Sequence, residues 1–200
     1  MSNKFSENAS GAVNQQERLR YISPELGHYL AGFADGEGSF NISVIRRNSD
    51  YQHGWKISAS FNISQKDAQI PQLFQETLKC GTIRFRRDGV CYFEVRTIKD
   101  LNTSVRAFFA QFPLLSTRQA TRCRLLMEAI TIMVKGEHLS DEGLEKILKI
   151  RELMISGHKR KYEITDILQN PQRLIRQTAE KSVEDRVPSA WRHAGSAKER

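Results

Sequence analysis

Apolar side chains at helical spacing open the ordered part of the chain. Four of them recur at intervals of three or four residues: Leu26, Tyr29, Leu30 and Phe33. This spacing places them on one face of a helix. Ser23 and Pro24 precede the stripe, and a capping serine followed by proline is a typical helix start. Glycines on both sides of Glu37 disfavour continuation, so the sequence predicts a helix that ends near residue 37.

Strict alternation of apolar and polar residues follows in two pairs of segments. They cover residues 40–45, 56–63, 82–87 and 90–97. A period of two predicts half-buried strands, and the Asp88-Gly89 turn between the last two is a strong hairpin signal. On the third segment we expect Ile83 and Phe85 to face the core.

Caps and apolar stripes predict further helices. These cover residues 67–78, 99–112, 116–134, 140–157 and, with a weaker pattern, 163–170. Asp67, Ser116 and Ser140 are the candidate capping residues.

The order αββαββα, followed by more helices, predicts an α+β fold. We expect a four-stranded antiparallel sheet with helices on one face and an open, polar and basic opposite face. Residues 21–162 would form this domain. Residues 1–20 would be a disordered arm, and residues 163–200 a basic tail that is partly helical or disordered.

Composition restricts the cellular setting. The 200-residue chain is 39% hydrophobic, enough for a core, but has no apolar run of the roughly 18 residues that a membrane span needs. Its first residues lack the apolar stretch of a secretory signal. Cys80, Cys91 and Cys123 lie far apart without a CxxC pair, which indicates free buried thiols rather than zinc or disulfides. We expect an intracellular, reducing compartment, bacterial cytoplasm or an organelle matrix or stroma, and neither secretion nor membrane association.

The net charge of +8 indicates a polyanionic partner, either nucleic acid or an anionic surface. Residues 40–99 hold ten Lys and Arg against five Asp and Glu, so the predicted sheet carries much of the surplus. A solvated surface on a basic protein would show the same surplus. Charge alone therefore leaves the partner open.

The nine residues from Leu30 to Gly38, Leu-Ala-Gly-Phe-Ala-Asp-Gly-Glu-Gly, resemble the motif that names the LAGLIDADG homing endonucleases. Three further segments resemble this family: residues 61–66, 113–119 and 136–162. The resemblance covers about residues 21–162 and contains one copy of the motif. Because single-motif members act as homodimers, it implies a homodimeric, intron-encoded type of enzyme that cuts double-stranded DNA at a specific site.

Glu37 is the candidate metal ligand. A carboxylate at the negative end of a helix is unfavourable unless a cation lies beside it. Few protein oxygens suit Mg²⁺, which keeps waters and shares phosphate oxygens, and the Gly36 carbonyl would be available at the same place. The resemblance implies that Glu37 is catalytic and that Asp35, the earlier acidic position, is structural. A solvated turn glutamate is the alternative at residue 37.

Two more catalytic candidates come from the resemblance. Gln65 and Arg118 match family positions near the scissile phosphate. Gln65 would orient waters, including the attacking one. Arg118 stands where the family commonly has lysine, and a fixed cation there would stabilise charge that develops on the phosphate. Without the resemblance, both would be interpreted as ordinary surface residues.

Small residues on the first predicted helix indicate close helix packing. Gly32 and Gly36 lie one turn apart, as do Gly27 and Ala31. Such spacing allows two helices to approach closely. The resemblance implies that Gly32 and Gly36 form a homodimer interface that brings both Glu37 residues together. Packing inside one subunit is the alternative.

The polar face of the predicted sheet is the candidate DNA-binding surface, because a two-stranded ribbon can enter the major groove. The non-core strand positions are the candidate base readers: Asn41, Ser43, Arg47, Lys56, Ser58, Ser60, Asn62, Thr82, Arg84, Arg86, Tyr92 and Glu94. Lys159, Arg160 and Lys161 are expected to contact phosphates. A dimer would read a long pseudo-palindromic site, one half on each sheet.

Two other functions are compatible with the same fold. An RNA maturase would bind intron RNA, and a regulator would bind DNA without cutting it. The acidic residue at 37, with Gln65 and Arg118, favours the nuclease without excluding intron RNA as a further partner. An HNH nuclease is excluded because its His-Asn-His set is absent.

Overall fold

A computed structural model describes residues 22–47, 54–154 and 161–168. Contacts among them group into two units. The larger unit comprises residues 22–44 and 57–154, and the smaller comprises residues 45–47, 54–56 and 161–168. The expected N-terminal arm, and the tail from residue 169 onward, lie outside the described residues.

The sheet contains the predicted strands. These are β1 (Ser39–Arg46), β2 (Trp55–Gln65), β3 (Thr82–Phe85) and β4 (Cys91–Val95). Their order is β1-β2-β4-β3, and β4 runs antiparallel to both β2 and β3. The central strands β2 and β4 are therefore paired on both sides, whereas β3 lies at an edge. The predicted α+β fold with a four-stranded sheet is confirmed.

The helices occur along the chain in the predicted order. The larger unit contains α2 (Pro24–Glu37), α3 (Gln69–Leu78), α4 (Ile98–Asp100), the π-helical turn η1 (Leu101–Val105), α5 (Arg106–Gln111), α6 (Thr117–Val134), the 3-10 turn η2 (Glu137–Leu139) and α7 (Asp141–Leu153). The smaller unit contains α8 (Ile164–Leu168). Ser23, Ser116 and Ser140 cap α2, α6 and α7. Among the described residues, no helix combines the length and apolar character needed to cross a membrane.

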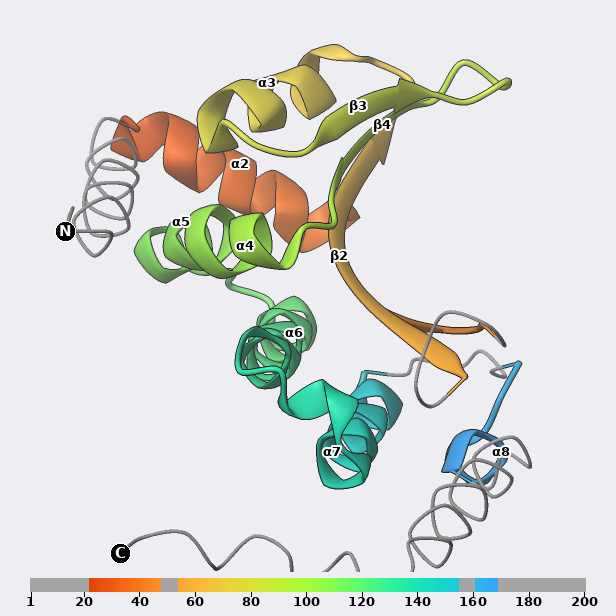
Figure 1. Ribbon diagram of the computed structural model, residues 1–200. Coiled ribbons are helices and arrows are strands. Elements are labelled where there is room, and N and C mark those ends of the chain that lie inside the picture. The colour runs from red at the N-terminus through yellow and green to blue at the C-terminus, as the bar shows by residue number, and fades with distance from the viewer. Residues whose placement is uncertain (1–21, 48–53, 155–160, 169–200) are drawn as a thin grey trace, which may run out of the picture. The chain divides into compact units, whose positions relative to one another are not determined.

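Phenylalanines form the centre of the core. Phe40 stacks on Phe61 at 5.1 Å, and Phe74 stacks on Phe93 at 6.0 Å, measured between ring centroids. These pairs join β1 to β2 and α3 to β4. In Figure 1, helices α2 to α5 lie on one side of the strands of the larger unit. The other face of these strands is the one that carries the polar positions.

Several boundaries differ from the predictions. The helix expected to reach Gly157 ends at Leu153, and Gly157 lies outside the described residues. The single helix expected over residues 99–112 is interrupted by the π-helical turn η1. Asp67 does not occupy the cap position itself, but its Oδ1 accepts a hydrogen bond from the Gln69 amide at 2.9 Å.

Phe85 was expected to face the core together with Ile83, but it is 65% exposed and is not part of the core. Phe85 is the last residue of β3, and an edge strand has a neighbour on one side only. Ile83, two residues earlier, is half-buried against the core as expected. The alternation in the sequence correctly gives the face of the sheet but not how far the core extends along it.

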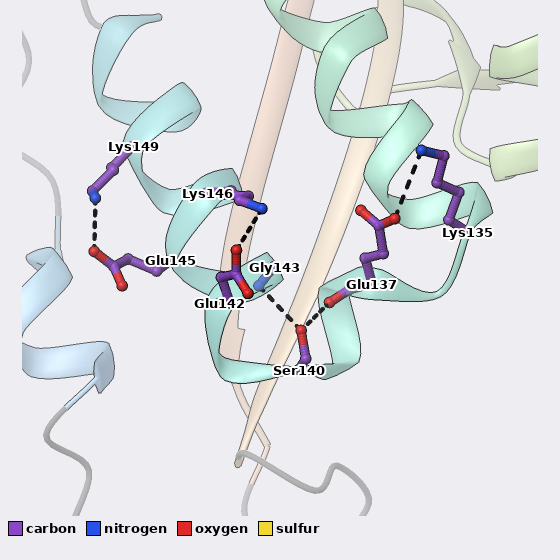
Figure 2. A network of polar contacts seen from close by, with 8 residues as sticks. All are labelled: Lys135, Glu137, Ser140, Glu142, Gly143, Glu145, Lys146 and Lys149. Carbon is purple, nitrogen blue, oxygen red and sulfur yellow. Dashed lines mark hydrogen bonds and ion pairs between the residues drawn. The ribbon is translucent and has the colours of Figure 1, made fainter.

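The turn between α6 and α7 is closed by short polar contacts (Figure 2). The Ser140 hydroxyl donates to the Glu137 carbonyl at 2.8 Å and accepts from the Gly143 amide at 3.1 Å. A Cβ atom at Gly143 would lie 1.9 Å from the Glu137 carbonyl oxygen, so only glycine fits there. Along α7, Glu142 pairs with Lys146 and Glu145 with Lys149, each at 2.7 Å, in the orientation that helices favour.

Asp35 connects the end of α2 to the start of α6. Its carboxylate accepts hydrogen bonds from the amides of Leu115 (3.1 Å) and Ser116 (2.7 Å), and from the Ser116 hydroxyl (2.6 Å). Partial burial raises the pKa of Asp35, but these three hydrogen bonds outweigh it and hold the pKa below its usual value. The expectation that Asp35 is structural agrees with these contacts.

Gln119 adds a second connection between the same two helices. Its side-chain amide donates to the carbonyls of Gly38 (2.7 Å) and Ala34 (3.4 Å). The side chain is 4% exposed, so these bonds are shielded from water. Together with Asp35, Gln119 fixes the last turn of α2 against the first turn of α6.

We predict that Asp35→Asn lowers the free energy of unfolding by about 1–2 kcal/mol at pH 7, because the charged acceptor of three hydrogen bonds is lost. The lowered pKa of Asp35 means that its stabilisation is complete above the ordinary carboxyl pKa of about 4. It is lost as the pH falls through the lowered value. The difference between the two proteins should therefore shrink in acid, as chemical denaturation at several pH values would show.

Asp67→Asn is the matched control, since Asp67 accepts a backbone hydrogen bond from the Gln69 amide at an exposed position. Its effect should be clearly smaller. Equal effects of the two substitutions would show that the connection between α2 and α6 contributes no special stability.

Candidate active site and nucleic-acid interface

Glu37 is the last residue of α2, and its side chain is exposed. Gly38 follows with φ −71° and ψ 146°, which turns the chain directly into β1. A Cβ atom at Gly38 would lie 2.4 Å from the Ala34 carbonyl oxygen, so the turn requires glycine through close approach. Because the Asp35 carboxylate is occupied by the α6 start, Glu37 is the motif carboxylate that faces solvent.

Arg118 lies in the first turn of α6, two residues after Ser116, which binds Asp35. Its side chain is exposed. The amides of a helix start carry partial positive charge, so this cation adds to an already positive region. The contacts of Asp35 and Gln119 thus bring the helix turn that bears Arg118 to the helix turn that bears Glu37.

Arg122 lies one helical turn after Arg118. Burial, and then the like charge of Arg118, lower the pKa of Arg122. Two guanidinium groups one turn apart destabilise a helix unless anions offset their repulsion. The pair is suited to phosphate oxygens. Arg122 was not among the residues predicted from the sequence, although its spacing from Arg118 was visible there.

Gln65 ends β2 and is half-buried. It pairs across the sheet with Cys91 of β4. Its position is therefore set by the sheet, whereas the contacts between α2 and α6 set those of Glu37 and Arg118. The amide at the end of a central strand has the rigid backbone support that a water-orienting group needs.

The small residues of α2 divide between its two faces. Gly27 and Ala31 are buried, and a Cβ at Gly27 would lie 2.3 Å from the Phe112 ring. Gly32 and Gly36 are exposed, and a Cβ at either would meet no heavy atom within 4 Å. Among the described residues, packing inside one subunit therefore accounts for the first pair but not for the second.

Many predicted base readers are accessible on the polar face. Asn41, Thr82, Arg84 and Arg86 are exposed, and Ser43, Ser58 and Tyr92 are half-buried. Thr82 lies opposite Glu94, which lies opposite Asn62, so three strands contribute to one row. Arg84, Tyr92 and Ser64 form the next row. Directly opposite residues share a face of an antiparallel sheet, so these rows belong to one surface.

The expectation that every one of these positions is accessible is wrong for three residues. Ser60, Asn62 and Glu94 are 9%, 6% and 5% exposed. All three lie on the central strands β2 and β4, where neighbouring strands on both sides shield short side chains. The alternating pattern gives their face correctly, but it does not report how deeply a central position is covered.

Glu94 is charged as well as buried, and it pairs with two arginines. Its Oε2 forms a short ion pair with Arg84, and its Oε1 lies 3.5 Å from Arg96 Nε. The Arg84 guanidinium also lies 5.9 Å from the centroid of the Tyr92 ring. Arg96 was not among the predicted readers, although it continues the alternation of Tyr92 and Glu94.

The smaller unit carries further basic candidates. Arg47 is exposed and Lys56 half-buried, and the Arg47 amide donates to the Gly54 carbonyl at 2.8 Å. Lys161 is exposed, with its Nζ 5.3 Å from the Tyr162 ring centroid. Lys159 and Arg160, the other two predicted phosphate contacts, lie outside the described residues.

Comparison with known proteins identifies the motif segment. Residues 30–126 match the family described as LAGLIDADG endonuclease. A probable intron-encoded endonuclease of Neurospora crassa is 33% identical over 131 residues, which make up 64% of this chain and 24% of that protein. The chain thus spans about a quarter of the length of this relative.

Solved structures agree with the observed fold. The homing endonuclease I-TnaI is 27% identical with a TM-score of 0.60, and the match covers 78% of this chain and 96% of that one. The LAGLIDADG meganuclease I-CpaMI, solved bound to uncleaved DNA, is 27% identical with a TM-score of 0.64, over 72% of this chain and 48% of that one. With its motif at residues 30–38, its αββαββα core and these matches, the chain is similar in sequence and fold to the LAGLIDADG endonucleases, and its residues 30–126 match that family.

Proposed function

We propose that the protein is a site-specific endonuclease that hydrolyses phosphodiester bonds of double-stranded DNA, of the intron-encoded homing type. The observation that carries this proposal is the arrangement at the α2 end. There a solvent-facing carboxylate, Glu37, is held by Asp35 and Gln119 next to the helix start that carries Arg118. A purely DNA-binding protein has no need of this exposed carboxylate near phosphate-binding cations.

A divalent metal ion, Mg²⁺ in our proposal, fits the oxygen donors at this place. Glu37 would supply a carboxylate oxygen and Gly36 a backbone carbonyl, both at an exposed helix end. Mg²⁺ prefers such sparse protein ligation, because it keeps waters and binds phosphate oxygens. When bound, the metal would polarise the phosphate and lower the pKa of a water.

The remaining groups act on the substrate directly. Arg118 stabilises the negative charge that develops on the phosphate, with Arg122 one turn behind it. Gln65 has one amide donor group and one carbonyl acceptor, and so can hold a water for attack while donating to a phosphate oxygen. The end of β2 positions the backbone of Gln65, and the start of α6 positions the backbone of Arg118, before substrate binds.

The polar face of the sheet would lie in the major groove. Arg84 and Arg86 suit guanine, Asn41 suits adenine, and Ser43, Ser58 and Thr82 can donate or accept. The DNA-bound homologue I-CpaMI supports DNA as the partner of this fold. The basic side chains of the smaller unit would add phosphate contacts, which position the protein without reading sequence.

A homodimer would complete the enzyme, since each chain carries one motif and both DNA strands must be cut. The outward face of α2 is suited to this contact. Gly32 and Gly36 leave open space there, and Tyr29, one turn earlier on the same face, is 52% exposed. Leu115, whose amide binds Asp35, is 91% exposed. A two-fold axis at this face would bring both Glu37 residues to one centre and impose a pseudo-palindromic target.

The three cysteines are free; Cys91 and Cys123 are buried as expected, whereas Cys80 is only half-buried. Burial raises the pKa of Cys80 to about 11 and that of Cys123 to about 12, so both thiols stay protonated and unreactive at neutral pH. A reducing intracellular compartment suits such thiols.

Whether intron RNA is a second partner stays a prediction, and binding of the purified protein to its own intron RNA would test it.

The proposed activity can be tested without a known target. A library of randomised duplexes is incubated with the full chain and Mg²⁺, and cut ends are sequenced. We expect cuts at one family of related sites with two-fold symmetry. Enrichment of bound but uncut duplexes would instead indicate a non-cleaving DNA-binding protein.

We predict that Glu37→Gln abolishes cleavage and leaves DNA binding largely intact. The amide keeps the shape of the side chain but loses the charge that holds the metal. Gel-shift and cleavage assays on the selected site separate the two effects. Glu25→Gln is the control, because Glu25 is an exposed carboxylate of the same helix at its other end. Normal cutting by Glu37→Gln would contradict the metal assignment.

We predict that Gly32→Leu weakens the dimer by about 1–3 kcal/mol or more, because a large side chain separates the helices. The subunit itself should fold, since a side chain at Gly32 begins in open space. Light scattering across a micromolar concentration series measures the association, and thermal melting checks the fold. Gln72→Leu on the exposed side of α3 controls for added apolar surface. A wild-type chain that is monomeric throughout would disprove the proposed dimer.

We predict that Arg86→Ala changes tolerance at particular base pairs, at a cost of about 1–3 kcal/mol of discrimination. Arg86 is exposed and its partner Asp88, at 3.1 Å, is exposed as well, so the guanidinium is easily transferred to a base. Cleavage profiling on a randomised target library measures the preference. A uniform loss of binding to all sequences, with a smaller salt dependence, would make Arg86 a phosphate contact instead.

A further inference from the structure

Glu94 is an unusual residue for a sheet surface that binds a polyanion. Its carboxylate lies on the polar face of β4, opposite Thr82 of β3 and Asn62 of β2. It is 5% exposed, whereas the side chains of its two partners, Arg84 and Arg96, are 56% and 55% exposed. A negative charge is thus buried beneath two positive charges that remain open to solvent.

Both carboxylate oxygens of Glu94 are occupied, each by a different arginine. Oε2 pairs with the Arg84 guanidinium and Oε1 with Arg96 Nε. A base edge would have to displace one of these cations and reach a side chain that is almost completely covered. Direct contact with cytosine, the base that a glutamate would read, therefore does not fit this geometry.

The two arginines keep donors for DNA. A guanidinium has five N–H groups. Arg84 uses Nη2 for Glu94, and Arg96 uses Nε. Each therefore retains donors that can bind guanine or phosphate. Tyr92 lies opposite Arg84 in the sheet, and the Arg84 guanidinium lies over the Tyr92 ring, 5.9 Å from the ring centroid. Glu94 and Tyr92 are thus two contacts that can orient the Arg84 guanidinium.

We propose that Glu94 is a specificity-determining positioning residue, which holds Arg84 of β3 and Arg96 after β4 as one recognition unit on the DNA-binding face. This inference rests on the proposed function of that face. Arg84 and Arg96 contact the DNA, and Glu94 fixes where their guanidinium groups point. The base preferences read by the two arginines are consequently coupled, since one carboxylate orients both.

Physical reasons favour a carboxylate here over a neutral side chain. A free arginine on a strand samples many rotamers and loses that freedom when it binds, whereas a restrained one has already lost it. The negative charge also reduces the general attraction of the two cations to any phosphate. Glu94 thus lowers sequence-independent affinity while preserving directed hydrogen bonds.

The test compares Glu94→Gln with Arg84→Ala and Arg96→Ala by binding and cleavage profiling of a randomised duplex library. Glutamine keeps the shape of the side chain but lacks the charge that attracts two guanidinium groups. We expect Glu94→Gln to lower discrimination on the order of tenfold at the same base pairs that the two arginine variants affect. We also expect stronger binding to unrelated DNA with a steeper salt dependence. In an Arg84→Ala, Arg96→Ala background, Glu94→Gln should change the profile little further.

Asp88→Asn is the matched control, because it removes a carboxylate from an exposed arginine pair on the same hairpin. It should leave the base pairs affected by Arg84→Ala unchanged. An altered preference for Glu94→Gln at a base pair that neither arginine variant affects would overturn the proposal, since Glu94 would then read that base itself. Unchanged preferences throughout would also overturn it and leave the ion pairs with a structural role alone.

Two further results would have a different meaning: misfolding of Glu94→Gln, and the absence of any sequence selection by the unaltered protein. If Glu94→Gln does not fold, as thermal melting would show, the coupling is measured between Arg84→Ala and Arg96→Ala. Non-additive changes at shared base pairs then support the unit, and independent changes contradict it. If the unaltered protein selects no DNA sequence at all, the proposed function itself fails, and the positioning role of Glu94 fails with it.

Discussion

The carboxylate of Asp35 is the contact on which the arrangement of the site depends. It accepts three hydrogen bonds from the loop that enters α6, so the end of one helix defines the beginning of another. Gln119 repeats the connection in the opposite direction, from α6 to the carbonyls of the α2 end. Hydrogen bonds restrict direction as well as distance, so the helix turn that bears Glu37 is fixed relative to the first turn of α6. Two acidic residues two positions apart therefore have different tasks, and the helical geometry decides which of them faces solvent.

The same helix shows how one residue type can serve two purposes. Gly27 is small because the Phe112 ring occupies the space of its side chain. Gly32 and Gly36 have open space instead, and no contact among the described residues explains their size. A glycine costs a helix about 1 kcal/mol relative to alanine. Two such residues on an exposed face agree with the proposed contact to a second copy of α2.

The fold and the motif residues could be predicted from the sequence because they follow local rules. Alternation, caps and the Asp-Gly turn depend on neighbours in the chain, and they gave the sheet, its polar face and most helix starts. Burial along a strand depends instead on which strands lie beside it. Glu94 and Asn62 were thus assigned to the correct face but with the wrong accessibility. Likewise, no local pattern predicts that Gln119 reaches Gly38, which lies 81 residues earlier in the chain.

The sheet and the candidate catalytic centre differ in which of their charged side chains are exposed. Strong positive charge increases binding to every DNA sequence, and a nuclease that binds everywhere spends its time away from its target. A buried carboxylate between two arginines lowers that general attraction but leaves donors that point in fixed directions. At the α2 end the arrangement differs, because the carboxylate of Glu37 is exposed together with Arg118, and only Arg122 is half-buried. On the proposed DNA-binding face the acidic side chain is thus buried and the two arginines are exposed, whereas at the candidate catalytic centre the acidic side chain is exposed, as the proposed metal site requires.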